Sequence, residues 1–238
     1  MTRFAFLFGV VAIALSANPA HAQIVLGQID NFEDGTAQSW GNITTNVTTG
    51  GPTGANDNFL QVATNGSAGG ASSRMLAINS TQWAGNYTTA GVSAVEFDVK
   101  NFWTSPMTIR AGFVTTTGAA AKGYISNGTT VNADGLWHHV FVSLAAGNMN
   151  AVNGPPAYST VLAGSFVDFR ILYSTGADML GDFTSPDATF MGLDNIHATT
   201  VPEPTSLTLF SLVGLAGISR MRRRATFSVS SKGLDCNA

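Results

Sequence analysis

The sequence predicts an all-β protein whose central part, residues 23–200 of 238, folds as an antiparallel β-sandwich with a jelly-roll-like form. Apolar residues recur there at every second position in short runs, which is the period of a strand with one buried face. Clusters of Gly, Asn, Thr and Ser separate the runs, as at 48–56 and 64–73, and such clusters form turns and loops. No window of a dozen residues in residues 23–200 holds the apolar stripe of an amphipathic helix.

Residues 1–22, which precede the sandwich, have the layout of a secretory signal peptide. Arg3 supplies a positive start, residues 4–15 are almost unbroken apolar sequence, and small residues flank a cleavage position after Ala22. We therefore expect an N-terminal signal helix and a mature chain that begins at Gln23, outside the cytoplasm. A buried helix or a short membrane anchor is the alternative.

The predicted strands follow in order along the body. They are 28–32, 58–63, 74–79, 95–100, 109–113, 123–126, 137–141, 167–173 and 189–198. Val95 and Phe97, for example, alternate with charged neighbours, which indicates a half-buried strand. In the run 167–173, Asp168 and Arg170 fall on the solvent face, where they can pair. Nine such strands with irregular loops favour a sandwich.

After the body, residues 201–224 combine three features in a fixed order. Pro202-Glu203-Pro204 imposes an extended backbone, because proline fixes φ and removes a hydrogen-bond donor. An apolar segment follows at 205–219, and about 15 residues are short for a bilayer that needs about 20. It predicts a short hydrophobic helix, a transient anchor, with a basic cluster on its cytoplasmic side: Arg220, Arg222, Arg223 and Arg224.

These features together resemble the PEP-CTERM sorting signal of exported proteins from exopolysaccharide-producing Gram-negative bacteria. The resemblance implies that a membrane-embedded exosortase, a cysteine protease-transpeptidase, processes the chain at or near the Pro-Glu-Pro motif. It also implies transient anchoring in the inner membrane, followed by the cell surface or extracellular matrix. The chain departs from the family in its tail, 225–238, which contains Cys236 and which processing would discard.

Charge narrows the class of partner. The chain has 11 Lys+Arg and 14 Asp+Glu, only 11% charged residues, which is a low density for a nucleic-acid binder. Residues 23–200 alone hold twelve acidic and five basic side chains, a net charge of −7, because the sorting arginines lie outside them. Such a domain repels anionic polymers, so neutral or cation-bridged glycans are the favoured partners.

The two edges of the body resemble jelly-roll carbohydrate-binding modules. Residues 30–36, followed by Trp40, are similar to the opening strand and turn of those modules, and residues 192–196 are similar to their closing strand. The stretch 137–140 also resembles concanavalin-like and laminin-G-like sandwiches, so the strand topology stays open. The resemblance to the modules implies glycan binding and a structural calcium ion.

In the modules that the body resembles, the positions that match Glu33 and Asp194 supply oxygen ligands to a buried calcium ion. Calcium takes about six to eight oxygen ligands, and Asp30 or Asp34 would add a second carboxylate. The ion would join the first strand to the last and offset repulsion in an acidic domain. The alternative is that Glu33 and Asp34 start a solvated turn and that Asp194 accepts backbone hydrogen bonds.

Aromatic residues near Gly-, Asn- and Ser-rich segments are candidates for a sugar-stacking platform, since flat apolar rings with a polar rim suit pyranose rings. They are Trp83, Tyr87, Trp103, Tyr124 and Tyr158. The alternative is that each of them fills the core. Trp40 and Trp137 are assigned to the core.

No catalytic constellation is predicted. His138 and His139 are neighbours in a strand and so point to opposite faces, which prevents their rings from sharing a metal or substrate. No G-x-S-x-G elbow occurs, and twelve acids do not single out a glycosidase pair. We therefore expect a non-enzymatic, glycan-binding or matrix-structural protein of an extracellular polysaccharide layer. A polysaccharide hydrolase or lyase, and a surface protein without a ligand, are the alternatives.

Overall fold

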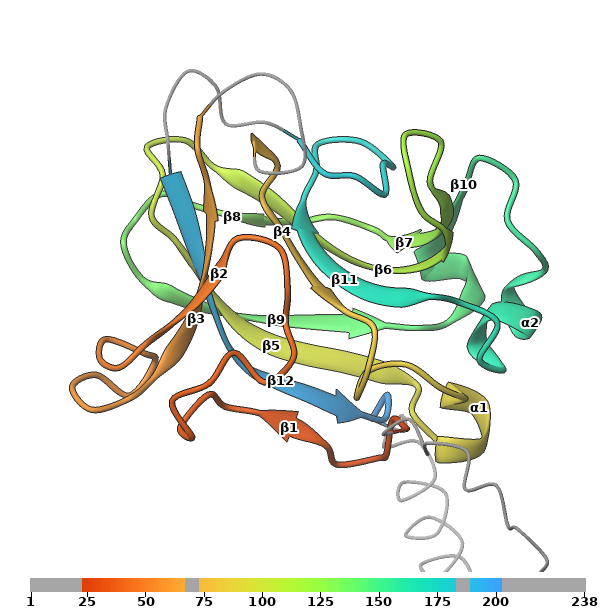
Figure 1. Ribbon diagram of the computed structural model, residues 1–238, viewed down its shortest axis with the longest axis horizontal. Coiled ribbons are helices and arrows are strands. Elements are labelled where there is room, and N and C mark those ends of the chain that lie inside the picture. The colour runs from red at the N-terminus through yellow and green to blue at the C-terminus, as the bar shows by residue number, and fades with distance from the viewer. Residues whose placement is uncertain (1–22, 67–72, 183–188, 203–238) are drawn as a thin grey trace, which may run out of the picture. The chain divides into compact units, whose positions relative to one another are not determined.

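The computed structural model describes residues 23–66, 73–182 and 189–202. Within them twelve strands form two six-stranded antiparallel sheets that face each other as a sandwich (Figure 1). This confirms the predicted fold class of the body. The chain divides into two units, Met1–Thr200 and Val201–Ala238, and the sandwich lies in the first. The signal helix and the hydrophobic helix that we predict near the two ends lie outside the described residues.

Sheet A contains both edges of the domain. Its strands run in the order β2-β3-β12-β5-β9, and β1 pairs with β12 next to the stretch that pairs with β3. The last strand is therefore central, and the first strand is hydrogen-bonded to it. The bounds are Ile29–Asp30 for β1, Thr44–Val47 for β2, Phe59–Thr64 for β3, Ala94–Asn101 for β5, Trp137–Ser143 for β9 and Thr189–Thr199 for β12.

Sheet B packs against sheet A from the other side of the core. Its order is β10-β7-β6-β11-β4, with β8 paired to β6 beside β7. The bounds are Leu76–Asn79 for β4, Met107–Thr116 for β6, Lys122–Ser126 for β7, Thr129–Val131 for β8, Met149–Val152 for β10 and Asp168–Tyr173 for β11.

Helical segments in the described residues are short. They are α1 (Tyr87–Ala90), α2 (Tyr158–Leu162) and a 3-10 turn at Ala146–Asn148. Asn86 caps α1, because its side chain accepts a hydrogen bond from the Thr89 N–H at 2.9 Å. A single turn cannot bury an apolar stripe, which agrees with the lack of helical periodicity in the body.

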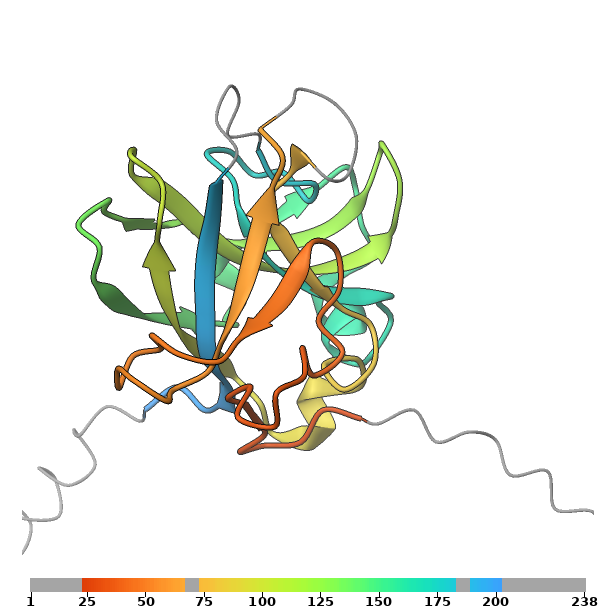
Figure 2. The same cartoon turned by 60° about the vertical axis from the view of Figure 1, so that its left-hand side comes forward.

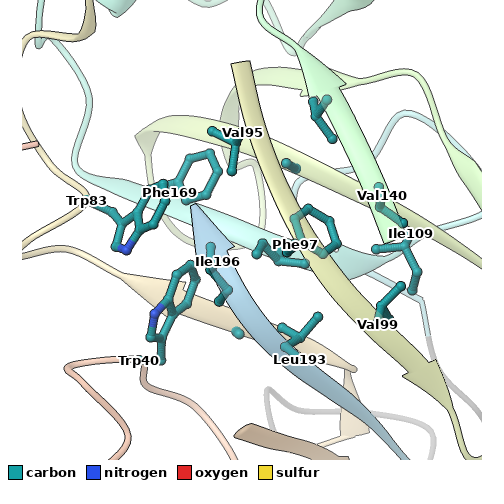
Figure 3. Packing of buried hydrophobic residues seen from close by; sticks show 14 of the residues in the cluster. Trp40, Trp83, Val95, Phe97, Val99, Ile109, Val140, Phe169, Leu193 and Ile196 are labelled. Carbon is teal, nitrogen blue, oxygen red and sulfur yellow. The ribbon is translucent and has the colours of Figure 1, made fainter. Parts of the chain in front are cut away.

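The core between the sheets is rich in aromatic rings (Figure 3). Trp83 stacks on Phe169 with ring centroids 5.3 Å apart, and Trp40 lies 5.9 Å from Trp83. The indole N–H groups of Trp40 and Trp83 donate to Asp30 at 2.7 and 2.6 Å. Trp40 is therefore in the core as predicted. Because Asp30 belongs to β1, the two hydrogen bonds connect β1 to the aromatic core.

The strands match the predicted runs, with three additions. Every predicted run overlaps a strand of the structure. The sequence does not predict β2, β8 and β10, because Thr44–Val47, Thr129–Val131 and Met149–Val152 are short and carry no clear alternation of apolar and polar residues.

The assignment of Trp137 to the core is wrong, because Trp137 belongs to the set of β9 side chains that points outward. Val140 and Val142 point into the core and are 2% and 6% exposed, whereas Trp137, His139 and Phe141 lie on the outer face of sheet A. Because the side-chain period of a strand is two, a shift of one residue moves a whole set of side chains to the other face. Both sets in β9 contain large apolar residues, so the pattern alone does not choose between them.

The chain itself covers the outer face of sheet B. Met179 is 1% exposed and fills the space above Gly112 and Gly123, where an added Cβ would lie 3.0 and 3.1 Å from its methyl carbon. Asp168 and Arg170 pair at 2.6 Å, as predicted, but both are buried rather than exposed to solvent. Arg170 also donates to the Met179 carbonyl at 2.7 Å, and this hydrogen bond holds Met179 over the outer face of sheet B.

The described chain enters and leaves the sandwich side by side. The Gly27 N–H donates to the Ala198 carbonyl at 2.8 Å, and the Ala198 N–H donates to the Gln28 carbonyl at 2.9 Å. In Figures 1 and 2 the red start and the blue end of the described chain both lie at the lower end of the sandwich. In the described part of the chain, no helix has the length and apolar character needed to cross a membrane.

Candidate functional site

Three outward side chains of β9 form a row at the edge of sheet A. Trp137, His139 and Phe141 alternate with inward residues, and alternate residues of a strand are about 6–7 Å apart, so the row is about 13 Å long. Phe141 is 40% exposed, and the His139 side chain is 58% exposed. We call these three residues the β9 row.

At one end of the β9 row, Trp137 belongs to an aromatic cluster outside the core. Its ring centroid lies 5.5 Å from that of Phe59, and the Phe59 and Phe102 rings stack at 6.1 Å. The ring centroids of Phe190 and Phe102 lie 4.3 Å apart, and Phe102 is 36% exposed. The Lys100 ammonium group lies 5.0 Å from the Phe102 ring centroid, within cation–π range. This cluster therefore offers aromatic surface to solvent on the outer face of sheet A.

Gly192 determines where the Trp137 indole lies. A Cβ at Gly192 would be 2.7 Å from Cη2 of Trp137, so the indole occupies the space above this glycine. Lys100 of β5 stands between the two residues in the sheet, and the indole reaches across it. The indole Nε1–H donates to the Gly50 carbonyl at 3.0 Å. Trp137 is thus held in place before any ligand arrives.

The middle of the β9 row is polar. Nδ1 of His139 lies 3.1 Å from an Asp98 oxygen, and Nε2 lies 3.5 Å from a Glu96 oxygen. Glu96 also contacts Nδ1 of His197 at 2.8 Å, and Asp98 accepts from the Asn195 amide at 2.9 Å. Each carboxylate therefore has a hydrogen-bonded side-chain partner, and the ion-pair contact between His139 and Glu96 joins the two groups on the sheet.

At the other end of the row, Phe141 forms part of the wall of a groove of about 230 Å³. The groove lies between the end of β9 and the turn from β7 to β8. Its lining residues are Ser126, Asn127, Gly128, Thr129, Phe141, Val142, Ser143 and Asn148, and none of these is charged. Hydroxyl and amide groups beside an exposed aromatic ring suit an uncharged, hydroxyl-rich ligand.

Two of the five aromatic residues predicted for glycan binding are in the core, which corrects the prediction for them. Trp83 and Tyr87 have no exposed surface, so neither ring can receive a sugar. Tyr87 opens α1, and its hydroxyl donates to the Trp83 carbonyl at 3.0 Å. The Gly- and Asn-rich sequence around them folds inward as a capped turn, whereas we expected an exposed loop.

The other three predicted aromatics, Trp103, Tyr124 and Tyr158, are partly buried against the core. The Tyr124 and Tyr158 rings lie 4.7 Å apart. Their hydroxyls donate to the carbonyls of Pro156 at 3.0 Å and Leu144 at 2.8 Å, and burial raises the pKa of Tyr158. The two tyrosine hydroxyls are therefore used within the domain.

Asp194 is the most buried of the four acids predicted as calcium ligands, with 1% exposure. Burial raises the pKa of Asp194 to about 7. A hydrogen bond from the Asn195 N–H at 2.7 Å favours the charged form and so lowers this pKa in part. The negative charges of Asp57, Asp98 and Glu33 raise this pKa further. Glu33 and Asp57 therefore lie close enough to Asp194 for their charges to act on its carboxyl group, and Asp57 is not among the predicted ligands.

A calcium ion at Glu33 and Asp194 would relieve this repulsion, and carboxylate oxygens are the ligands it prefers. In residues 23–66, 73–182 and 189–202, however, no three or more His, Cys, Asp or Glu side chains are arranged to hold a metal ion. One Glu33 oxygen already accepts from the Asn58 N–H at 2.8 Å. Carbonyl or amide oxygens would therefore complete the coordination shell.

Asp30 and Asp34, the other two predicted ligands, have hydrogen-bond partners of their own. Asp30 is 3% exposed and accepts from two indole N–H groups and the Gln82 amide at 2.6–2.9 Å, and burial raises its pKa. Asp34 is exposed and accepts from the Thr36 N–H and hydroxyl, both at 2.8 Å. These donors use the oxygens that calcium would need.

The adjacent histidines have separate partners. His138 contacts Asp134 at 3.0 Å, and this hydrogen bond lowers the pKa of Asp134. His139 faces Asp98 and Glu96 on the outer face of sheet A. The structure therefore does not place the two imidazoles on one ligand.

Residues 200–224 match the family model of the PEP-CTERM protein-sorting motif. The match spans the Pro-Glu-Pro motif, the apolar segment and the arginine cluster, so the chain carries this sorting motif. Pro202 is exposed, and the rest of the motif, including Glu203, Pro204 and the four arginines, lies outside the described residues.

No curated protein gives a significant match, but solved structures of similar architecture do. One is a family 11 carbohydrate-binding module from Clostridium thermocellum in complex with a β-1,3-1,4-mixed-linked tetrasaccharide, with 16% identity, a TM-score of 0.44, and coverage of 74% of this chain and 99% of that chain. A module specific for non-crystalline cellulose has 14% identity, a TM-score of 0.43, and coverage of 74% and 96%. A putative glycoside hydrolase from Bacteroides vulgatus has 12% identity and a TM-score of 0.35, and the match covers 71% of this chain and 84% of that chain.

Proposed function

We propose that this chain, an exported protein with a PEP-CTERM sorting motif, binds neutral glycans through the β9 row and does not cleave them. The sorting motif implies a stage in which the chain is anchored in the membrane. An exosortase-type enzyme is the proposed processing partner, and the extracellular polysaccharide layer is the proposed destination. Glycan binding would retain the processed protein in that layer.

The observation that carries the proposal is the β9 row with its two ends. Trp137 and Phe141 place aromatic surface about 13 Å apart on one exposed edge, with polar groups between them. Aromatic faces pack against the apolar faces of sugar rings, while hydroxyl and amide groups bond to sugar hydroxyls. The row is long enough to contact more than one sugar unit.

Charge favours a neutral ligand. The groove beside Phe141 has no charged residue in its lining, and Glu96 and Asp98 flank the middle of the row. A uronic acid or sulfated sugar would meet these carboxylates and the net charge of −7 on the body. Two positive charges oppose this trend: Lys100 at the Trp137 end, and Arg110, which donates to the carbonyl of the groove residue Ser126 at 2.8 Å.

A polysaccharide hydrolase or lyase is the second candidate, because Glu96 and Asp98 both point outward beside the β9 row. Glycoside hydrolysis uses two carboxyl groups about 5–10 Å apart on opposite sides of the scissile bond. Here both carboxylates stand on one strand and are bonded to imidazole or amide groups, which suits a positioning role. Release of reducing ends that Glu96→Gln abolishes would establish the second candidate.

The proposal is tested by screening the full chain, purified in detergent, against immobilised neutral and anionic polysaccharides. The parent chain should bind at least one neutral glycan. Trp137→Ala and Phe141→Ala should each weaken that binding roughly tenfold, since each removes a stacking surface. Val167→Ala, which truncates a 47% exposed side chain before β11, should bind like the parent.

Thermal unfolding of each variant separates loss of binding from loss of fold. Because Trp137 and Phe141 lie outside the core, both variants should retain a cooperative transition. A parent chain that binds no neutral glycan, or folded variants that bind as the parent does, would contradict the proposal.

A further inference from the structure

The start of the described chain presents apolar side chains to solvent. Val25, Leu26 and Ile29 are 57%, 50% and 50% exposed. The Gln28 N–H donates to the Val25 carbonyl at 3.1 Å, and Gly27 has a φ of 84°, so Val25–Gln28 form a β-turn with Leu26 near its tip. Turn tips usually carry Gly, Pro, Asn, Asp or Ser. We call Val25–Ile29 the apolar turn.

The apolar turn is fixed to the sandwich. Ile24, just before it, is 2% exposed, and its N–H donates to the Ala84 carbonyl at 3.0 Å. The Gly27 N–H donates to the Ala198 carbonyl, and Ile29 pairs with His197 of β12. The turn is thus held from both sides, and its apolar side chains are exposed at a defined place.

That place is where the chain departs toward the sorting motif. The carbonyl of Thr199, the last residue of β12, still accepts from the Ser93 N–H at 3.0 Å. The apolar segment of the motif starts at Thr205. Five extended residues span at most about 17 Å, so Thr200 lies within that distance of the anchor. The apolar turn, bonded to Ala198, is therefore close to the bilayer whenever the segment 205–219 is embedded.

We propose that the apolar turn is a membrane-contact site for the lipid interface while the chain is anchored. Val25 and Leu26 would enter the boundary between headgroups and acyl chains, where exposed apolar side chains leave water. Apolar burial would drive this contact, because the acidic body is not attracted to anionic lipids. After processing removes the anchor, this small surface would not retain the protein on the membrane.

The contact would also orient the sandwich. In sheet A the register aligns Thr199, Ala94 and Ser143 at one end, and Gly192, Lys100 and Trp137 toward the other. Contact through the apolar turn therefore directs the Trp137 end of the β9 row away from the lipid. The proposal does not depend on what the β9 row binds.

The test uses the chain from Gln23 to Ala238 in phosphatidylcholine–phosphatidylglycerol vesicles at a ratio of about 3:1. Cys236→Ser removes the native thiol, and Leu26→Cys then carries a polarity-sensitive fluorophore. Leu136→Cys is the matched control, since Leu136 is 63% exposed and directly precedes β9 at the opposite end of sheet A. Emission and quenching by headgroup-proximal nitroxide lipids are recorded for both.

The label at position 26 should shift to the blue on reconstitution and be quenched at least twofold more than the label at position 136. Equal quenching at the two positions would overturn the proposal. A blue shift at position 26 that appears in detergent and grows with protein concentration would also overturn it, because it would identify a second copy of the chain as the partner. Val25→Ser in the labelled chain should reduce the lipid-dependent shift.

Discussion

At the scale of single residues, Asp194 makes the stability of the sandwich depend on pH. Its pKa in the folded state is raised to about 7 from an ordinary value of 3.8. The native state therefore binds more protons than the unfolded state between these pH values, and the free energy of unfolding falls as pH rises through that window. The cost above pH 7 is about 4 kcal/mol, and Asp30, whose pKa is also raised, adds to it with the same sign.

Asp194→Asn should therefore stabilise the metal-free protein at pH 7.5 and leave it almost unchanged at pH 4. Asparagine keeps an oxygen that can accept the hydrogen bond from the Asn195 N–H. Urea unfolding of the parent and the variant at the two pH values, with a chelator present, measures this. A variant that loses stability at pH 7.5 would show that the carboxylate is needed in its charged form.

Calcium should reverse the penalty at Asp194. A cation bound by Glu33 and Asp194 in the folded state alone would raise the melting temperature by mass action. The full chain, first shown to be free of metal, should melt at a higher temperature in millimolar calcium, and Glu33→Gln and Asp194→Asn should each remove that gain. No calcium-dependent shift in the metal-free parent would end the calcium hypothesis.

At the scale of elements, β12 and β9 together hold the aromatic end of the proposed site. Gly192→Ala places a methyl group 2.7 Å from the present position of Trp137 Cη2, so the indole must move. The same Cβ would lie 3.1 Å from Phe59 and 3.3 Å from Phe102, so the aromatic cluster must also adjust; stability should fall modestly, whereas glycan affinity should fall severalfold. Tryptophan fluorescence and glycan titration of Gly192→Ala measure both effects. Unchanged affinity with a displaced indole would separate Trp137 from binding.

The sequence predicts strands well where one face is clearly polar. The alternation of Val95 and Phe97 with Glu96 and Asp98 gives both the position and the facing of β5. In β9, Val140, Phe141 and Val142 are all large and apolar, so the same reasoning finds the strand but does not show which face is buried. The exposure of Phe141 follows from the pairing of β9 with β5, which is a tertiary contact.

The candidate site was harder to predict for a related reason. Loop composition suggests exposure for Trp83 and Tyr87, yet both are needed to fill the core beside Phe169. Trp137 looks like a core residue from its size, but the missing side chain at Gly192 gives its ring a place on the outer surface. The signal that the sequence does contain is His139, which lies two residues after Trp137 and so on the same face of the strand, since a polar side chain marks a face that meets water.

At the scale of the whole molecule, the net charge of the chain hides two oppositely charged parts. The body carries −7, and the arginine cluster belongs to a sorting motif that processing would remove. Intact mass spectrometry of the mature protein from its host should show a chain that begins at Gln23 and lacks the arginines. Replacing Arg222, Arg223 and Arg224 with Glu should reduce membrane retention. A mature pool that keeps residue 238 would contradict this account of sorting.

The most direct test of glycan binding is to locate a bound neutral glycan on the surface of the full chain by hydroxyl-radical footprinting. Both aromatic ends of the β9 row present surface that radicals can reach, and a ligand along the row would cover it. We predict that a bound neutral oligosaccharide reduces oxidation of Trp137 and Phe141 and leaves Val167 unchanged. Binding without protection of Trp137 and Phe141, or with protection confined to Met179 and its neighbours over sheet B, would contradict the central claim.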